Sequence, residues 1–217
     1  DVGSIDLLIG GSPCQGFSFA GKQLNFDDPR SKLFFEFVRL KDELNPRFFI
    51  LENVRMKQES QDIISKYLGV EPVRFNSALV SAQNRQRLFW TNIDFDLPDD
   101  KGIILADILE NGITDRQKSH CLDANYFKGG NLKSYFEKHR RQLVFKEFLK
   151  DDWPLLDHAK SKYLSHLSFR KLTPLECERL QTVPDNYTNH VSNTQRYKML
   201  GNGFTVDVVA HILKGLH

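Results

Sequence analysis

The sequence is poor in cysteine, and its few cysteines are far apart. Cys14, Cys121 and Cys177 form no Cys-x-x-Cys pair, which argues against a disulfide scaffold and against a cysteine-rich zinc site. The seven histidines show no metal-ligand spacing, so we expect no bound metal. Free thiols persist in a reducing compartment, and we therefore expect a cytoplasmic protein.

The sequence also lacks long apolar runs. No apolar stretch reaches the roughly 18 residues that suggest a membrane-spanning helix, so we expect no transmembrane segment and no membrane partner. The N-terminal residues, DVGSIDLLIGG, have neither the basic start nor the apolar core of a signal peptide. With 217 residues, of which 40% are apolar, the chain can build the core of one substantial domain.

Net charge is low but unevenly distributed. Residues 116–150 hold nine lysines and arginines against three acidic residues, a net charge of +6, whereas the whole chain carries only +2. A basic segment of this kind can mark a polyanion-binding face. From charge alone, an ordinary solvated surface explains it equally well.

The first half of the chain predicts a parallel sheet. Residues 5–10 (IDLLIG) form a short apolar run that predicts a strand buried on both faces. Residues 31–44 predict a helix capped by Ser31, and residues 48–51 predict a second buried strand. Strand, helix and strand in this order form a βαβ unit. The predicted apolar face of the helix consists of Leu33, Phe37, Leu40 and Leu44.

A further helix is predicted at Gln58–Leu68, and two more strands within residues 72–80 and 87–93. Residues 107–170 are basic, contain a Gly-Gly turn and show no buried-strand run, so we predict a small separate domain or a long insertion there. It divides the chain into residues 1–106, 107–170 and 171–217.

The last segment begins with a strong helix-start pattern. Thr173 is a cap residue, Pro174 occupies the first helical position, and Glu176 completes a capping box. The final stretch, GNGFTVDVVAHIL, predicts a glycine-rich turn followed by an apolar strand or helix.

Two residues at predicted strand ends are candidates for chemistry. Cys14 follows the first strand directly and is flanked by glycines that allow close approach of a substrate. Its thiol is either a nucleophile or a buried structural group. Glu52 ends the second strand, and if the two strands are neighbours both side chains face one pocket. A carboxyl group there can give or share a proton; the alternative is a capping or ion-paired glutamate.

Gln83, Arg85 and Arg87 alternate in the segment SAQNRQRLFW. On a strand they would all point to one polar, cationic face. Two arginines in register suit phosphate or carbonyl oxygens. A solvated strand edge is the alternative. We expect Cys121 and Cys177 to be chemically inert.

Five ordered segments together resemble the DNA cytosine-5 methyltransferases. They are GGSPCQGFS, ILENV, SAQNRQRLFW, RKLTPLECERLQTVPDNY and MLGNGFTVDVVAHIL. The spacing of the first three is most similar to the de novo DNA methyltransferase branch and related phage or bacterial enzymes. The resemblance covers about residues 5–95 and 168–214. It implies an α/β fold: a Rossmann-like methyltransferase sheet that lacks its N-terminal strands and carries a small inserted target recognition region.

The resemblance also implies roles for the candidate residues. The thiolate of Cys14 adds to carbon 6 of a flipped-out cytosine, which activates carbon 5, and the Glu52 carboxyl group contacts ring nitrogen 3. Arg85 and Arg87 hold the cytosine carbonyl, the cysteine loop and a nearby phosphate, and Asn53 organises the turn after its strand. Residues 107–170 correspond to the target recognition region on double-stranded DNA. The implied DNA contacts are Gln15, Ser18, Lys128, Lys133, Arg140 and Arg141.

The sequence departs from the family at the methyl donor, S-adenosylmethionine. The Phe-x-Gly-x-Gly loop and the acidic residue that hold it in the family are missing. Pro13, Asn202, Gly203 and Phe204 match what remains of the donor site. We therefore expect a fragment, one half of a split enzyme, or a chain completed by a partner. Alone it should bind the donor poorly and methylate little, and its unpaired sheet edge should favour self-association.

Two alternatives to a DNA methyltransferase stay open. The first keeps the chemistry and takes transfer RNA as the substrate, because one branch of the family does so. The second is a non-catalytic paralogue that binds DNA or regulates a partner enzyme. The presence of Cys14, Glu52, Arg85 and Arg87 together favours catalysis. For a bacterial or phage enzyme the resemblance implies a place at the nucleoid and in restriction-modification.

Overall fold

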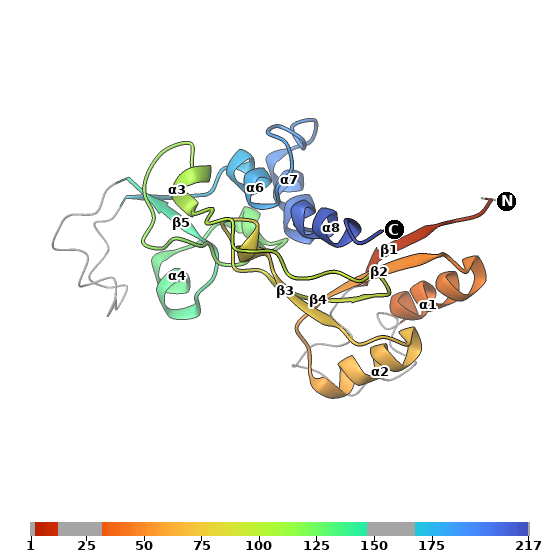
Figure 1. The fold of residues 1–217 in the computed structure, drawn as a ribbon. Helices are drawn as coiled ribbons and strands as arrows, with labels where there is room; N and C mark the ends of the chain where they lie inside the picture. Colours follow the sequence, from red (N-terminus) through yellow and green to blue (C-terminus); the bar gives the residue numbers. More distant parts are fainter. Residues whose placement is uncertain (1–2, 13–31, 147–167, 217) are drawn as a thin grey trace. The chain divides into compact units, whose positions relative to one another are not determined.

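The computed structural model describes residues 3–12, 32–146 and 168–216, which form two compact units. The first unit comprises Asp1–Asn76, Gln86–Leu97 and Ile212–His217, and the second comprises Ser77–Arg85 and Pro98–His211. Figure 1 gives the elements of both. The predicted division at residues 107 and 171 differs from these units, because the basic segment shares its contacts with the C-terminal one.

The first unit is a four-stranded mixed sheet. Its strands are β1 (Leu7–Gly11), β2 (Phe48–Val54), β3 (Val73–Asn76) and β4 (Gln86–Thr91), in the order β1-β2-β4-β3. β1 and β2 are parallel, whereas β4 is antiparallel to both of its neighbours. The predicted βαβ unit is confirmed and the fold class is α/β, but the sheet is mixed and not parallel as predicted, because β4 runs antiparallel to β2 and β3.

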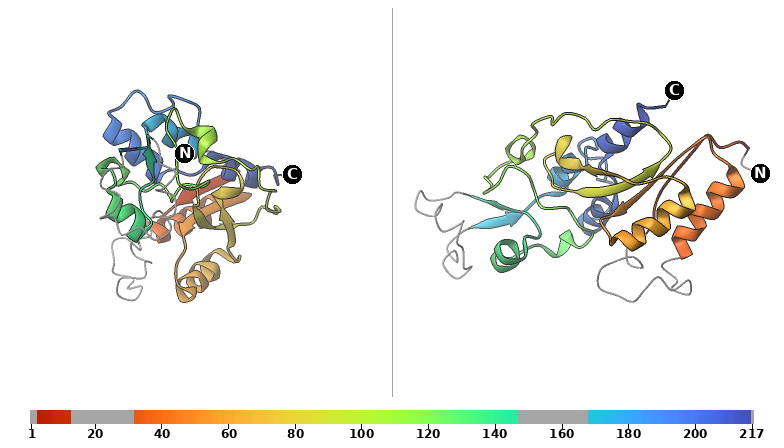
Figure 2. Two further views of the ribbon diagram at one scale, coloured as in Figure 1. Left: turned by 90° about the vertical axis from the view of Figure 1, so that its left-hand side faces the viewer. Right: turned by 60° about the horizontal axis from the view of Figure 1, so that its bottom comes forward.

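Two helices, α1 (Lys32–Leu44) and α2 (Gln58–Leu68), cover one face of this sheet (Figure 2). Alternate residues of β2 and β4, such as Leu51 and Trp90, point into the core that these helices close. The indole Nε1 of Trp90 donates to Ser65 Oγ at 3.0 Å, so the one polar atom of this fully buried ring is satisfied.

The apolar face predicted for α1 is wrong at its first member. Leu33 is 51% exposed. The predicted Phe37 does face the core, and Phe34 and Val38 accompany it there at the i, i+3, i+4 spacing. The predicted cap, Ser31, lies outside the described residues. The predicted helix Gln58–Leu68 is confirmed residue for residue as α2.

The prediction that the first strand is buried on both faces is also wrong. Ile9 of β1 is 38% exposed, and its neighbours Leu7 and Leu8 are only partly buried. Within the described residues β1 pairs with β2 alone, so it is an edge strand. At Gly10 a Cβ atom would lie 2.7 Å from the Phe37 ring, and α1 packs directly on the backbone there.

The second unit combines short helices with a two-stranded antiparallel sheet of β5 (Leu143–Phe145) and β6 (Phe169–Lys171). Its other described elements are η2 (Ser77–Leu79), α3 (Leu105–Ile108), η3 (Tyr126–Lys128), α4 (Leu132–Lys138), α6 (Pro174–Leu180), α7 (Asn193–Asn202) and most of α8 (Val206–Leu213), whose last two residues are assigned to the first unit. The final stretch predicted as strand or helix is thus the helix α8. The capping box of α6 is confirmed, with Thr173 Oγ1 accepting from Glu176 N.

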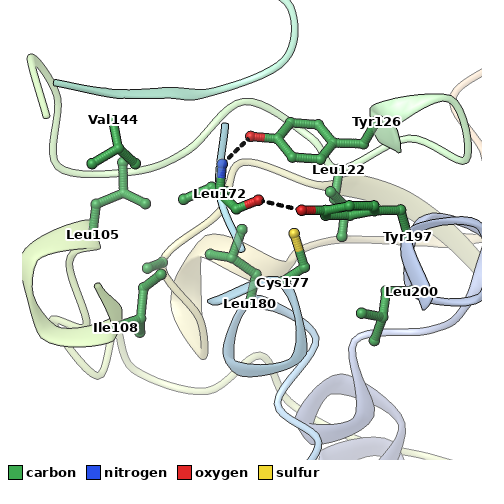
Figure 3. Close-up of a cluster of buried hydrophobic side chains, with 11 residues drawn as sticks. Leu105, Ile108, Leu122, Tyr126, Val144, Leu172, Cys177, Leu180, Tyr197 and Leu200 are labelled. Carbon is green, nitrogen blue, oxygen red and sulfur yellow. Dashed lines mark hydrogen bonds between the residues drawn. The ribbon is translucent and has the colours of Figure 1, made fainter. Parts of the chain in front are cut away.

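One apolar core joins the basic segment of this unit to its C-terminal segment (Figure 3). It contains Leu105, Ile108, Leu122, Tyr126, Val144, Leu172, Cys177, Leu180, Tyr197 and Leu200. The prediction that residues 107–170 hold no buried strand is wrong, since all three side chains of β5 are buried. Leu143 and Phe145 pack against the buried ring of Tyr135, a tertiary contact that a run of three apolar residues does not reveal.

Candidate functional site

An ion pair marks the carboxyl end of β2 in the first unit. Glu52 stands opposite Phe89 in the β2–β4 register, and Arg87 lies two residues from Phe89 on the same face of β4. The Arg87 Nε atom lies 2.8 Å from Glu52 Oε1, and the two side chains are 14% and 13% exposed. Charged groups enclosed to this degree are normally paired. The pair therefore fixes the direction of the Glu52 carboxylate at the end of the strand.

Asn53, whose side chain lies on the opposite face of β2 from Glu52, anchors the end of β1. Its buried amide nitrogen lies 3.3 Å from the Ser12 carbonyl oxygen and 3.1 Å from Ser12 Oγ. In the parallel register Gly11 is the partner of Glu52. The start of the cysteine loop is thus held beside the carboxylate. The loop residues that sequence analysis selected, Pro13, Cys14, Gln15 and Ser18, lie outside the described residues.

Gln83, Arg85 and Arg87 do not lie on one strand, so the prediction that they alternate along one is wrong. β4 begins at Gln86. Before it, the backbone of residues 82–84 pairs with Ser119: Asn84 N donates to Ser119 O, and Ser119 N donates to Ala82 O. This pairing assigns Arg85 to the second unit and leaves Arg87 in the first.

Arg85 is buried and binds backbone carbonyl groups. It is 3% exposed. Its Nη1 atom donates to Leu122 O at 2.9 Å, and its Nη2 atom donates to Gly203 O at 2.8 Å. These bonds tie the segment at Leu122 to the turn that follows α7. The geometry suits a guanidinium group that positions two segments of backbone.

Two glutamines extend this arrangement. Gln83 Nε2 donates to Leu180 O at 2.7 Å and to Gln181 Oε1 at 2.8 Å, while Gln83 Oε1 accepts from Leu122 N. Gln181 Nε2 donates to Gly203 O at 3.1 Å. We call Gln83, Arg85 and Gln181 the buried polar cluster. Gln181 was not among the predicted site residues, although it directly follows the capped helix α6 and ends the segment RKLTPLECERLQ, which carries part of the family resemblance.

A close backbone approach accompanies the buried polar cluster. A Cβ atom added to Gly201 of α7 would lie 2.3 Å from the carbonyl carbon of Asp123 and 2.4 Å from the nitrogen of Ala124. Only glycine permits a contact of this kind. The turn after α7 and the segment 121–124 are therefore held together by both packing and hydrogen bonds.

The residues predicted to face the methyl donor lie at this turn. Asn202 is exposed, whereas Gly203 and Phe204 are partly buried. The Gly203 carbonyl is engaged by Arg85 and Gln181, so the backbone conformation is fixed from inside.

The predicted DNA contacts of the second unit divide into two kinds. Lys128, Lys133 and Arg140 are exposed, and Arg140 lies 3.4 Å from Asp123. Arg141 is partly buried and donates to Gly129 O at 2.8 Å, so it stabilises the predicted glycine turn. The first three side chains are accessible to a phosphate backbone.

Burial shifts the titration of several groups in this unit. Burial, followed by the charges of Arg116 and His139, lowers the pKa of His120 to about 4. Its imidazole is therefore neutral near pH 7 and lies 2.6 Å from Arg116 Nη1. Burial also raises the pKa of the Cys177 thiol, which disfavours the thiolate and agrees with the expected inertness of this cysteine.

Among the described residues no group of histidine, cysteine and acidic side chains has the geometry to hold a metal ion. No helix in that part of the chain is long and apolar enough to span a bilayer.

Comparison with known proteins identifies relatives along the whole chain. The family model described as C-5 cytosine-specific DNA methylase matches residues 1–144 and 99–217. The Type II methyltransferase M1.ScrFI of Lactococcus lactis subsp. cremoris is 32% identical over 246 residues, covering 96% of this chain and 61% of that protein. M.Eco47II of Escherichia coli is 28% identical, covering 94% and 62%. The chain spans about three fifths of the length of these curated relatives.

Solved structures of distant relatives share the fold. The Entamoeba histolytica methyltransferase EhMeth superposes with a TM-score of 0.71 at 16% identity, covering 97% of this chain and 76% of that one. The DNMT2 structure from Spodoptera frugiperda gives a TM-score of 0.66 at 20% identity, covering 97% and 78%. At these identities the likeness extends to the architecture alone, which is the predicted Rossmann-like one.

Proposed function

The chain belongs to the C-5 cytosine-specific DNA methylase family, and from this premise we propose that it is the catalytic-motif portion of an enzyme that methylates carbon 5 of a flipped-out cytosine in duplex DNA. The chain spans about three fifths of the length of its curated relatives, and we expect methyl transfer to require the part that it does not span. Type II methyltransferase relatives support a role in restriction-modification.

The observation that carries the proposal is the position of Glu52 at the mouth of the cysteine loop. Its register partner, Gly11, precedes Cys14 by three residues. Three residues of extended chain span at most about 11 Å, so the backbone at Cys14 lies within that distance of Gly11. Asn53 anchors Ser12, the last described residue before the loop, and the parallel register places Gly11 beside Glu52. A thiol and a carboxyl group within reach of one pyrimidine ring is the arrangement that the chemistry requires.

The chain's residues would activate the cytosine in two coupled steps. The Cys14 thiolate forms a bond to carbon 6, the π pair of the carbon 5–carbon 6 double bond forms a carbon 4–carbon 5 double bond, and the π pair of the carbon 4–nitrogen 3 bond moves to ring nitrogen 3. Glu52 stabilises the charge that develops at that nitrogen by a hydrogen bond, and Arg87 holds the Glu52 carboxyl group in place. Carbon 5 of the adduct is then nucleophilic. When bound, S-adenosylmethionine supplies the methyl group that carbon 5 takes up.

The same adduct makes a second, simpler reaction possible. Carbon 5 can take a proton from water, lose its original hydrogen as a proton and then expel the thiolate, which restores the aromatic ring. Atoms and charge balance, and the only net change is exchange of the carbon 5 hydrogen with solvent. The reaction uses Cys14 and Glu52 and needs no methyl donor.

The buried polar cluster and the turn after α7 have a supporting role in this proposal. Arg85 is a positioning residue that fixes Gly203 and Leu122 from inside. The exposed Asn202 and the ring of Phe204 would hold one side of the donor. Pro13 remains a predicted donor contact. Poor donor binding by the isolated chain, and self-association through the exposed strand β1, remain predictions; a clean monomer by light scattering at high concentration would contradict the second.

The exchange reaction tests the proposed function directly. A duplex oligonucleotide mixture containing cytosine tritiated at carbon 5 is incubated with the chain, and tritium release into water is measured. We expect release above the rate without protein, and slower release from transfer RNA carrying the same label. Faster release from transfer RNA would favour that substrate. Duplex binding without release from either nucleic acid would favour the non-catalytic paralogue and overturn the proposal.

A further inference from the structure

Two neighbouring tyrosines of the second unit hold the backbone of Leu172, one at its amide nitrogen and the other at its carbonyl oxygen (Figure 3). The Tyr126 hydroxyl accepts from Leu172 N at 2.9 Å, and the Tyr197 hydroxyl donates to Leu172 O at 2.8 Å. All three residues are at most 3% exposed. Tyr126 belongs to η3, Tyr197 to α7, and Leu172 directly follows β6. The two hydrogen bonds therefore hold these three elements together.

The chain neighbours of these two tyrosines and of Leu172 bring three lysines together. Phe127 and Lys128 follow Tyr126, Lys171 precedes Leu172, and Lys198 follows Tyr197. The Nζ atoms of Lys128 and Lys198 lie 5.7 and 5.4 Å from the centre of the Phe127 ring. Lys171 Nζ lies 4.6 Å from the centre of the Tyr197 ring and 3.0 Å from the Phe127 carbonyl oxygen. We call Phe127, Lys128, Lys171 and Lys198 the lysine cluster.

The lysines of this cluster have no carboxylate partner among the described residues. Within residues 32–146 and 168–216, no carboxylate lies within ion-pair distance of Lys128, Lys171 or Lys198. The ammonium groups lie beside the Phe127 and Tyr197 rings, and Lys171 also donates to the Phe127 carbonyl group, so in the described part of the chain these charges contact rings and backbone and no carboxylate. Lys128 and Lys198 are exposed and Lys171 is partly buried.

We infer that the lysine cluster is a phosphate-binding surface for the DNA backbone, and that Lys171 and Lys198 bind phosphates although they lie outside the predicted target recognition contacts. The inference rests on the proposed function, since it takes duplex DNA as the partner. Ammonium groups on a fixed scaffold position the backbone of a duplex without reading its sequence. Their placement on η3, β6 and α7 would hold the duplex against the same unit whose Gly203 turn the buried polar cluster fixes.

Salt dependence of binding provides the test. Affinity of the 217-residue chain for a duplex is measured from low to moderate salt by fluorescence anisotropy, for the wild type and for the double variant Lys171→Gln/Lys198→Gln. Each phosphate neutralised contributes about 0.9 to the slope of log affinity against log salt. We expect the double variant to reduce the magnitude of that slope by about 2 and to weaken binding at low salt at least tenfold, roughly equally for unrelated sequences.

The control is Lys41→Gln. Lys41 also lies over an aromatic ring, 5.7 Å from the centre of Phe49, but belongs to α1 of the first unit, and its removal should leave the slope unchanged. Circular dichroism confirms that each variant is folded. The inference would be overturned if the folded double variant kept the wild-type slope and affinity for the duplex, or if it lost affinity for RNA alone. Duplex binding by the wild type would in either case leave the proposed function standing. A wild type that binds no duplex would overturn both.

Discussion

Replacing Glu52 with glutamine is expected to slow tritium release from carbon 5 of cytosine by about a thousandfold, the upper range for losing one charge-stabilising group in an active site. Glutamine keeps the shape of the side chain and can still accept from Arg87 Nε, which lies 2.8 Å from the carboxylate. It cannot take on the protonation states of a carboxyl group at ring nitrogen 3. The loss should therefore appear in the rate, with duplex affinity changed less than threefold.

Glu59→Gln is the matched control, because Glu59 is an exposed carboxylate of α2 in the same unit. It should release tritium at the wild-type rate. Equal rates for Glu52→Gln and the wild type would remove Glu52 from the chemistry. A large fall in duplex affinity with an unchanged rate at saturation would instead make Glu52 a binding residue.

Replacing Gly201 with alanine is expected to destabilise the second unit by about 3 kcal/mol or more, at or above the upper end of ordinary overpacking. The new Cβ atom would overlap the Asp123 carbonyl carbon, at 2.3 Å, and the Ala124 nitrogen, at 2.4 Å. Both are backbone atoms, which no rotamer change can move. The expected fall in melting temperature is about 10 °C for a chain of this size.

Urea denaturation followed by circular dichroism measures this change. Thr194→Ala, at an exposed position of the same helix α7, should shift the midpoint little, because it touches no buried group. If Gly201→Ala unfolded at the wild-type midpoint, the close approach of α7 to residues 123–124 would be contradicted. The hydrogen bonds of Arg85 to Gly203 and Leu122 would then be the remaining evidence that these two segments are held together.

Features that depend on neighbours in sequence were predictable. The capping box of Thr173 and Glu176, which begins α6, is a local pattern. The helix α2 ends at Gly69, whose left-handed conformation stops the helix. The parallel pairing of β1 with β2 followed from the βαβ order, whereas the register that places Gly11 opposite Glu52 came from the structure. These signals placed the strand ends and hence the candidate site.

Features that depend on distant partners were not predictable from the same patterns. The alternation of Gln83, Arg85 and Arg87 suits a strand, but Ser119 pairs with the backbone before Gln86 and ends the alternation there. The burial of Arg85 depends on carbonyl groups 37 and 118 residues away. Lys171 and Lys198 gain significance only through the two hydrogen bonds to Leu172, which no local spacing indicates.

The central claim is that position 14 supplies a nucleophile beside Glu52. A duplex in which 2-pyrimidinone replaces the target cytosine tests it most directly, because this base lacks the 4-amino group and accepts a thiol more readily, with sulfur joining carbon 6 and a proton joining carbon 5. Peptide mapping by mass spectrometry should locate the adduct on Cys14, with none in Cys14→Ser and a full yield in Cys121→Ser. An adduct on another residue, or a bound duplex that yields no adduct, would contradict the account.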